Sequence, residues 1–132
     1  FTFNQRSVAE ILQMVRVLAG IVGVSDRGER LASELEAGLD QLRAAARAWP
    51  RRPRVYFEEW DDPLISGIRW VDELVEIAGG EPVFPERRAA RLAKDRIVRS
   101  EDVIARPGLR CGPAGTPSRP CATATSTRSS RR

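Results

Sequence analysis

The sequence has no histidine, and its two cysteines, Cys111 and Cys121, both lie near the C-terminal end. Without histidine, the chain has neither a Cys/His zinc site nor a histidine general base. No stretch approaches the roughly 18 consecutive apolar residues of a membrane span. Residues 1–4 show neither the basic region nor the apolar core of a signal peptide. Because both cysteines lie near the C-terminal end, they say little about the redox compartment of any folded part.

Acidic residues are absent after position 106. Residues 1–106 contain all 18 Asp and Glu and 17 of the 22 Lys and Arg, so they have a net charge of −1. The last 26 residues hold five arginines and are rich in Pro, Gly, Thr, Ser and Ala. Such a composition cannot bury a core, so we predict a disordered basic tail over 107–132. Because the excess positive charge lies in this tail, we expect no nucleic-acid partner.

Two segments near the start have helical periodicity. In residues 7–20, Ser7 and Glu10 have capping-box spacing, and apolar residues follow at helical intervals. A longer helix is predicted from Ser25 to about Trp49, before Pro50. Its apolar residues recur at three- and four-residue steps: Leu31, Leu35, Leu39, Leu42, Ala46 and Trp49. At about 1.5 Å per residue, roughly 24 residues span about 36 Å, enough to bridge two lobes.

The remaining part up to residue 106 alternates extended and helical patterns. We expect a strand at 54–58, an acidic loop at 59–63 and a third helix at 66–78. An irregular segment at 81–96, a short extended piece at 97–98 and a brief helix at 101–106 should follow. This order favours an α/β fold.

Residues 55–67, VYFEEWDDPLISG, and 70–80, WVDELVEIAGG, resemble cobalamin-binding members of the class III periplasmic binding proteins. In these substrate-binding proteins of ABC importers, one long rigid helix joins two α/β lobes, and the ligand lies between the lobes. The resemblance covers about residues 1–106. It implies the end of an N-terminal lobe, an inter-lobe helix and a partial C-terminal α/β lobe, at residues 1–24, 25–50 and 51–106.

The chain departs from this family at both ends. It begins on alternating apolar residues without an initiator Met, so we expect that most of the first lobe is missing. After Arg106 the family would continue with a hydrophobic strand, whereas this chain continues with Pro107-Gly108. Because acidic residues and hydrophobic periodicity stop together, we hypothesise that the reading frame shifts near Arg106.

The resemblance implies a binding protein and no enzyme. The expected ligand is cobalamin or a related corrinoid, which the intact parent would capture in the periplasm or another extracytoplasmic space and deliver to an ABC permease. That parent would be a monomer, peripheral to the membrane through the permease, and would need no cofactor or metal. A ferric-siderophore or haem-binding protein of the same fold is the alternative.

Trp60 is the first candidate for ligand contact, because a large flat ligand needs aromatic surface and a few polar orienting groups. Asp61, Asp62, Pro63 and Leu64 share its loop and are predicted to meet the ligand or the edge of its cleft. The alternative for Trp60 is anchoring of the loop to its own lobe. The alternative for the acidic residues is capping of the helix that follows.

Glu101 is a candidate for permease docking, because the resembled family places an acidic residue at the start of this helix. Its carboxylate would pair with arginines of the permease. The alternative is an ordinary acid in the first turn of a helix. Trp70 lies four residues before Leu74 in the third helix. We expect it to belong to the hydrophobic core rather than to the ligand-binding surface.

Two charged clusters suggest other functions. The carboxylates of Glu58, Glu59, Asp61 and Asp62 could serve a metal site or a carboxylate-dependent enzyme. A strand, however, directs successive side chains to opposite faces, so adjacent acids seldom converge. The basic run over 87–96 lacks an aromatic platform, and we expect it to be a solvated surface.

Overall fold

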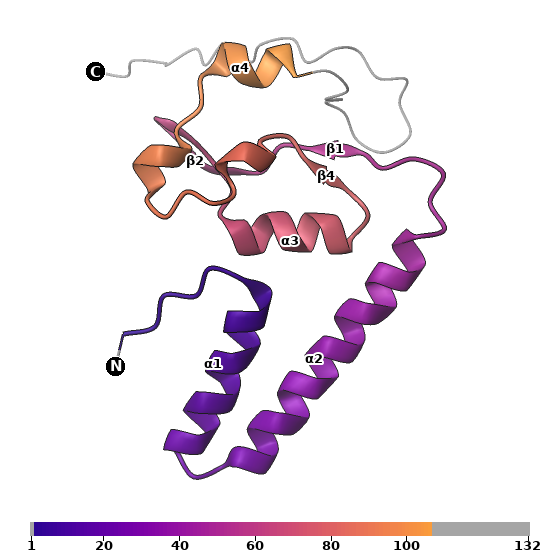
Figure 1. Cartoon of the computed structure of the whole chain (residues 1–132), viewed down its shortest axis with the longest axis vertical. Coiled ribbons are helices and arrows are strands. Elements are labelled where there is room, and N and C mark those ends of the chain that lie inside the picture. The colour runs from indigo at the N-terminus through magenta and orange to yellow at the C-terminus, as the bar shows by residue number, and fades with distance from the viewer. Residues whose placement is uncertain (1, 107–132) are drawn as a thin grey trace, which may run out of the picture.

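The computed structural model describes residues 2–106, so the predictions for the basic tail and its two cysteines lie outside the described residues. Within this range, two long helices form one part and a smaller unit of short strands and helices forms the other (Figure 1). This mixture of helices with short paired strands is consistent with the predicted α/β fold. No helix in the described range is both long and apolar enough to cross a membrane.

Helix α1 (Val8–Ile21) begins as the capping pattern predicts. The Ser7 side chain accepts a hydrogen bond from the Glu10 backbone N–H, at 3.2 Å. The Glu10 carboxylate accepts one from the Arg6 N–H, at 2.6 Å. Both bonds satisfy backbone donors near the helix start, where no intrahelical acceptor exists. The chain then turns at Gly23, whose φ of 75° suits glycine.

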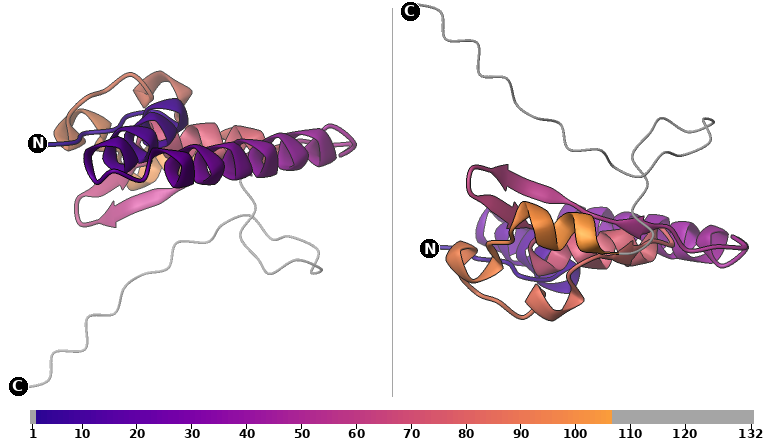
Figure 2. Two further views of the ribbon diagram at one scale, coloured as in Figure 1. Left: turned by 90° about the horizontal axis from the view of Figure 1, so that it is seen from below. Right: turned by 90° about the horizontal axis from the view of Figure 1, so that it is seen from above.

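Helix α2 (Ser25–Ala46) packs along α1 through small residues. Ala32 is fully buried, and a Cβ added at Gly28 would lie 2.2 Å from that of Ala19. The two backbones therefore approach closely at Gly28, and Figure 2 shows the helices side by side. The helix ends at Ala46, earlier than the predicted end near Trp49. The Trp49 N–H bonds the Ala46 carbonyl in a closing turn, because a residue before proline disfavours helical backbone.

The strands are short and form two separate pairs. Strand β1 (Arg54–Val55) pairs in parallel with β4 (Glu81–Pro82). Strand β2 (Glu58–Asp61) pairs antiparallel with β3 (Leu64–Ser66), and this hairpin projects from the smaller unit (Figure 2). The prediction of an acidic loop over 59–63 was therefore wrong: most of it is strand, and only the turn is loop. The pairing of Trp60 with Ile65 is typical of stable cross-strand neighbours.

Helix α3 (Arg69–Ile77) begins later than predicted, because Ser66 belongs to β3 and Ile68 is the N-cap. It ends before Gly79, whose φ is 86°. The segment predicted to be irregular contains β4 and the two 3₁₀ helices η1 (Pro85–Arg87) and η2 (Ala93–Arg96). A final short helix, α4 (Ser100–Ala105), matches the predicted brief helix within one residue.

The core of the smaller unit lies between its strands and α4. Val83, Phe84 and Val98 are buried there, and Tyr56 packs edge-on against Phe84 with ring centroids 5.9 Å apart. The guanidinium of Arg106 lies 4.7 Å from the centre of the Phe84 ring, in cation–π geometry. This core fixes the base from which the hairpin projects. Trp70, predicted to be core, is half-buried on α3.

Candidate functional site

The five predicted ligand contacts lie together on the β2–β3 hairpin. Trp60 and Asp61 are in β2, Asp62 and Pro63 form the turn, and Leu64 opens β3. The Asp62–Pro63 peptide bond is cis. Leu64 is half-buried against the core, whereas the other four residues are exposed. Neither acidic residue caps α3, so the helix-capping alternative for Asp61 and Asp62 is wrong.

Trp60 has an indole that is held at one edge and open elsewhere. Its Nε1–H donates to the Asp62 carbonyl across the turn, at 3.0 Å. The residue is 59% exposed, so most of its surface remains available. Tryptophan side chains combine large apolar surface with a polar handle, which suits contact with a flat ligand. The geometry therefore allows stacking on an indole whose orientation is already restrained.

Arg96, at the end of η2, anchors the base of the hairpin. It is only 2% exposed, and its guanidinium donates to the Ser66 carbonyl and to the Glu59 carboxylate. The Ser66 hydroxyl in turn donates to the Arg96 carbonyl, at 3.2 Å. A buried arginine requires such partners, because an unpaired buried charge is costly. The predicted solvated surface over 87–96 was therefore wrong for Arg96.

The backbone following Arg96 adds a second attachment. The Val98 N–H donates to the Leu64 carbonyl at 2.9 Å, and Ile97 forms an isolated antiparallel bridge with Ile65. The predicted extended piece at 97–98 therefore serves as a partner for β3. Both attachments hold β3, and the pairing of Arg96 with Glu59 also holds β2, so Trp60 is positioned from both strands.

Asp72 is a buried carboxyl below the hairpin. With Tyr56, Ser66 and Gly67 it lines a cavity of about 10 Å³. Burial raises the pKa of Asp72 to about 6, with a lesser opposing effect from the charge of Arg88. Burial also raises the pKa of Tyr56 to about 12, assisted by Glu58. Burial thus disfavours the ionised forms of these two side chains.

A larger groove of about 1040 Å³ lies between α1, α2 and α3. Leu12, Leu39, Trp49 and Ile77 contribute apolar surface, and several charged side chains line it as well. None of the hairpin residues 60–64 lines this groove. The structure therefore contains two separate candidate surfaces, the hairpin and the groove, and sequence analysis identified only the first.

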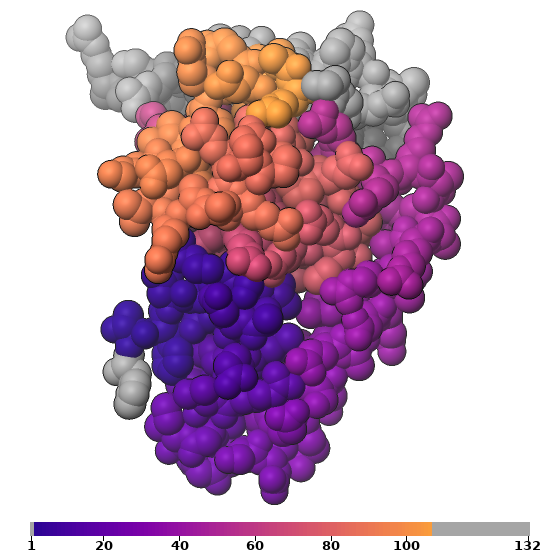
Figure 3. All heavy atoms as spheres, in the orientation of Figure 1, coloured from indigo at the N-terminus to yellow at the C-terminus, as the bar shows by residue number. Residues whose placement is uncertain are grey.

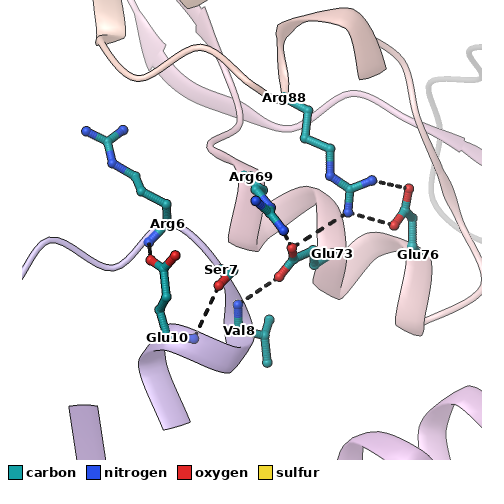
Figure 4. A network of polar contacts seen from close by, with 8 residues as sticks. All are labelled: Arg6, Ser7, Val8, Glu10, Arg69, Glu73, Glu76 and Arg88. Atoms are coloured by element: carbon teal, nitrogen blue, oxygen red, sulfur yellow. Dashed lines mark hydrogen bonds and ion pairs between the residues drawn. The ribbon is translucent and has the colours of Figure 1, made fainter. Parts of the chain in front are cut away.

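Glu73 stands at the end of the groove where α1 meets α3. Its carboxylate accepts the Val8 N–H at 2.7 Å and the Arg69 guanidinium at 2.8 Å (Figure 4). Arg88 lies 3.9 Å from Glu73 and donates twice to Glu76, at 2.8 and 2.9 Å. The contact from Val8 to Glu73 joins the two parts of the described chain, and the arginine contacts hold the Glu73 and Glu76 carboxylates in place.

Glu101 lies in the first turn of α4, far in sequence from the hairpin. Its side chain is 73% exposed and pairs with Arg99 at 3.3 Å. Such an exposed pair contributes little to stability, so its carboxylate is available to an external arginine.

The carboxylates of the hairpin do not act as one cluster. Glu59 pairs with Arg96. Over residues 2–106, no three Asp or Glu side chains are grouped so that they could hold a metal ion.

Comparison with known proteins gives one match. A model of the Fe/B12-type periplasmic binding protein family matches residues 1–105. No curated protein and no solved structure matches the chain. The match covers both helices of the first part, the hairpin and all of α4. The chain therefore belongs to the Fe/B12-type family of periplasmic binding proteins.

Proposed function

We propose that this chain is part of the extracytoplasmic substrate-binding component of an ABC importer, with cobalamin or a related corrinoid as ligand. Membership of a periplasmic binding family supports a binding role outside the cytoplasm and argues against catalysis. The division of the chain into the end of one lobe, an inter-lobe helix and part of a second lobe belongs to the same proposal.

The observation that carries the choice of ligand is the exposed, edge-restrained indole of Trp60. A corrin is a large, flat ring system with peripheral amides. It would stack on the face of Trp60, while the exposed carboxylates of Asp61 and Asp62 accept hydrogen bonds from those amides. Pro63 would supply apolar contact at the turn, and Leu64 would support the turn from the core.

The anchoring of the hairpin supports recognition without large rearrangement. Arg96 and Val98 hold β3 through buried hydrogen bonds, so the ligand would not need to order the hairpin on binding. Such preorganisation lowers the entropic cost of association. Glu101, on α4, would dock the loaded protein onto arginines of the permease.

The test is a titration of the ¹⁵N-labelled chain with cyanocobalamin, followed by NMR. We expect chemical-shift changes at the Trp60 indole N–H and at the amides of 59–64. The affinity should be weak, in the millimolar range, because the resemblance implies that the other wall of the cleft lies in the first lobe. Trp60→Ala should abolish the changes. Trp49→Ala, at a tryptophan of similar exposure on the groove, should not.

A ferric hydroxamate siderophore and haemin should be titrated in parallel. Shifts at the hairpin with the ferric chelate or haemin and none with cyanocobalamin would replace the corrinoid assignment with the alternative one. Shifts confined to residues of the groove would move the ligand site away from Trp60. An unchanged spectrum with all three ligands at millimolar concentration would remove the hairpin as a site.

A further inference from the structure

The groove between α1, α2 and α3 has apolar side chains at its floor and charged ones at its rim. Helices α1 and α2 diverge from the turn that joins them, and α3 lies across the open end (Figure 1). Leu12 and Ile77 are buried and Leu39 is half-buried, and all three line the groove. In the space-filling view, α2 forms one edge of the molecule, with the smaller unit beside its C-terminal end (Figure 3). The volume of about 1040 Å³ is close to the upper end for small-molecule sites.

Each carboxylate that lines the groove is paired with an arginine. The pairs are Glu36–Arg16, Asp40–Arg43, Glu73–Arg69 and Glu76–Arg88. In such pairs the two charges compensate each other, and the carboxylate oxygens receive charge-assisted hydrogen bonds. The negative charge of the rim is therefore already compensated by arginines of the described chain.

Two arginines of the rim, Arg47 and Arg52, are not compensated in this way. Both are exposed and line the groove, and neither pairs with a carboxylate of residues 2–106. Arg52 donates one long hydrogen bond, of 3.4 Å, to the Gly80 carbonyl. A guanidinium group has five N–H donors in a planar fork, which matches the oxygens of a carboxylate or a phosphate. The two side chains therefore offer open donors and uncompensated positive charge to the groove.

The fold fixes the backbone on both sides of these arginines. Gly79, just past α3, lies so close to α2 that a Cβ added to it would be 2.9 Å from the Ala46 Cβ. Strand β1 pairs in parallel with β4, which follows Gly79 closely. Arg47 directly follows α2, and Arg52 lies two residues before β1. The segment that carries both arginines is therefore held beside the C-terminal end of α3.

Trp49 lies between the two arginines in the sequence and lines the same groove. Its backbone N–H donates to the Ala46 carbonyl at 3.1 Å, so its backbone is fixed in the turn that closes α2. Its side chain is not enclosed, since the residue is 53% exposed. An indole offers a flat apolar face on which another planar ring can stack. This part of the groove thus combines an aromatic surface with two open cationic groups.

We propose that the groove binds a phosphate monoester that carries a planar aromatic ring, with the phosphate on Arg47 and Arg52 and the ring on Trp49. A phosphate monoester has a charge of about −1.5 to −2 at pH 7, which matches two guanidinium groups better than the single charge of a carboxylate does. Its terminal oxygens can accept from both arginines. A nucleoside monophosphate is one member of this class. The site is separate from the Trp60 hairpin and does not depend on the function proposed for that hairpin.

The first test is a fluorescence titration of the full chain with AMP, in a background with Trp60→Phe and Trp70→Phe that leaves Trp49 as the only tryptophan. We expect quenching with a dissociation constant of about 0.1–1 mM. Ribose 5-phosphate lacks the base and adenosine lacks the phosphate, so each should compete with AMP about tenfold more weakly than unlabelled AMP itself would. No quenching by AMP at about 10 mM, or equal affinity for AMP and either fragment, overturns the proposal.

Substitution of single arginines locates the phosphate. Arg47→Gln and Arg52→Gln should each weaken AMP binding about tenfold, because each removes charge-assisted hydrogen bonds. Arg51→Gln is the matched control, since Arg51 is an exposed arginine of the same segment that does not line the groove. It should change the affinity by less than about twofold, because solvent and salt screen its charge. An equal loss in all three variants would indicate attraction to the basic segment as a whole and overturn the site.

Arg47→Lys separates a binding role from a structural one. Lysine keeps the positive charge but not the planar fork, so this variant should bind AMP severalfold more weakly than wild type. Circular dichroism and urea denaturation should show that the Arg47→Gln and Arg52→Gln variants fold with wild-type stability. Lower stability of both Gln variants, together with full AMP binding by Arg47→Lys, would assign the arginines to the negative end of the α2 dipole and overturn the proposal.

Discussion

The carboxylate of Glu73 in α3 accepts a hydrogen bond from the backbone N–H of Val8, at 2.7 Å, although the two residues are 65 positions apart. Val8 is the first residue of α1, and its N–H has no acceptor within the helix. Glu73 thus caps α1 from a different helix and places a negative charge at the positive end of the helix dipole. The contact couples the helix pair to the smaller unit.

Glu73→Gln should lower the free energy of unfolding by about 1–2 kcal/mol, because it removes a charged acceptor from Val8, Arg69 and Arg88. Urea denaturation followed by circular dichroism measures the change. Glu81→Gln is the matched control, since Glu81 is an exposed glutamate of β4. Equal stability of the two variants would show that the Val8 contact contributes nothing.

Arg96→Ala should destabilise the protein by about 2–4 kcal/mol, because it removes a buried donor and leaves the Ser66 carbonyl unsatisfied. It should also increase the mobility of Trp60, seen as lower fluorescence anisotropy in a background with Trp49→Phe and Trp70→Phe. Arg91→Ala, at an exposed arginine of the same segment, should change stability by less than about 0.5 kcal/mol. An unchanged Trp60 anisotropy in Arg96→Ala would contradict the anchoring role.

Asp72 should make stability fall as pH rises from about 4 to about 6. Burial raises its folded-state pKa to about 6, above the ordinary value of 3.8, so the folded protein binds the proton more tightly than the unfolded chain. The resulting stabilisation is fully present below pH 4, is lost through this window and amounts to at most about 3 kcal/mol. The measurement is the difference in unfolding free energy between wild type and Asp72→Asn, at several pH values. A difference that does not vary with pH would show that the pKa is not raised.

Glu101→Arg should reduce uptake of the ligand without changing ligand affinity. The substitution replaces an exposed carboxylate with a charge that repels the arginines expected on the permease. The assay is transport by an intact family member that carries the same Arg-Ser-Glu-Asp helix start, with ligand binding measured separately. Glu81→Arg provides a charge reversal at another exposed glutamate. Normal uptake by the Glu101 variant would dismiss the docking role.

Local signals in the sequence predicted the helices well. Ser7 and Glu10 determine the start of α1 through contacts within four residues. Periodicity also located α2, yet it could not show which face is inner. The small residues Gly28 and Ala32 pack against α1, whereas Leu31 and Leu35 remain exposed. The partner of a helix face depends on residues distant in the sequence.

The hairpin was harder to predict for the same reason. The candidate residues from Trp60 to Leu64 lie together, as expected for neighbours in sequence. Their strand structure depends on Arg96 and Val98, about 30 residues further along, and nothing local distinguishes Arg96 from the exposed Arg91. The groove was missed because α3 must pack against both α1 and α2 before it exists, and periodicity within one helix does not show that packing.

The anchoring of the hairpin by Arg96 also sets an order of events during synthesis. Ser66 leaves the ribosome 30 residues before the arginine that holds it. At typical elongation rates of about 5–20 residues per second, the strands wait roughly 2–6 s for this partner. Until then the acidic hairpin has no buried cation to fix it. A nascent chain that stops before position 96 therefore carries the complete Trp60 segment in a form that lacks its anchor.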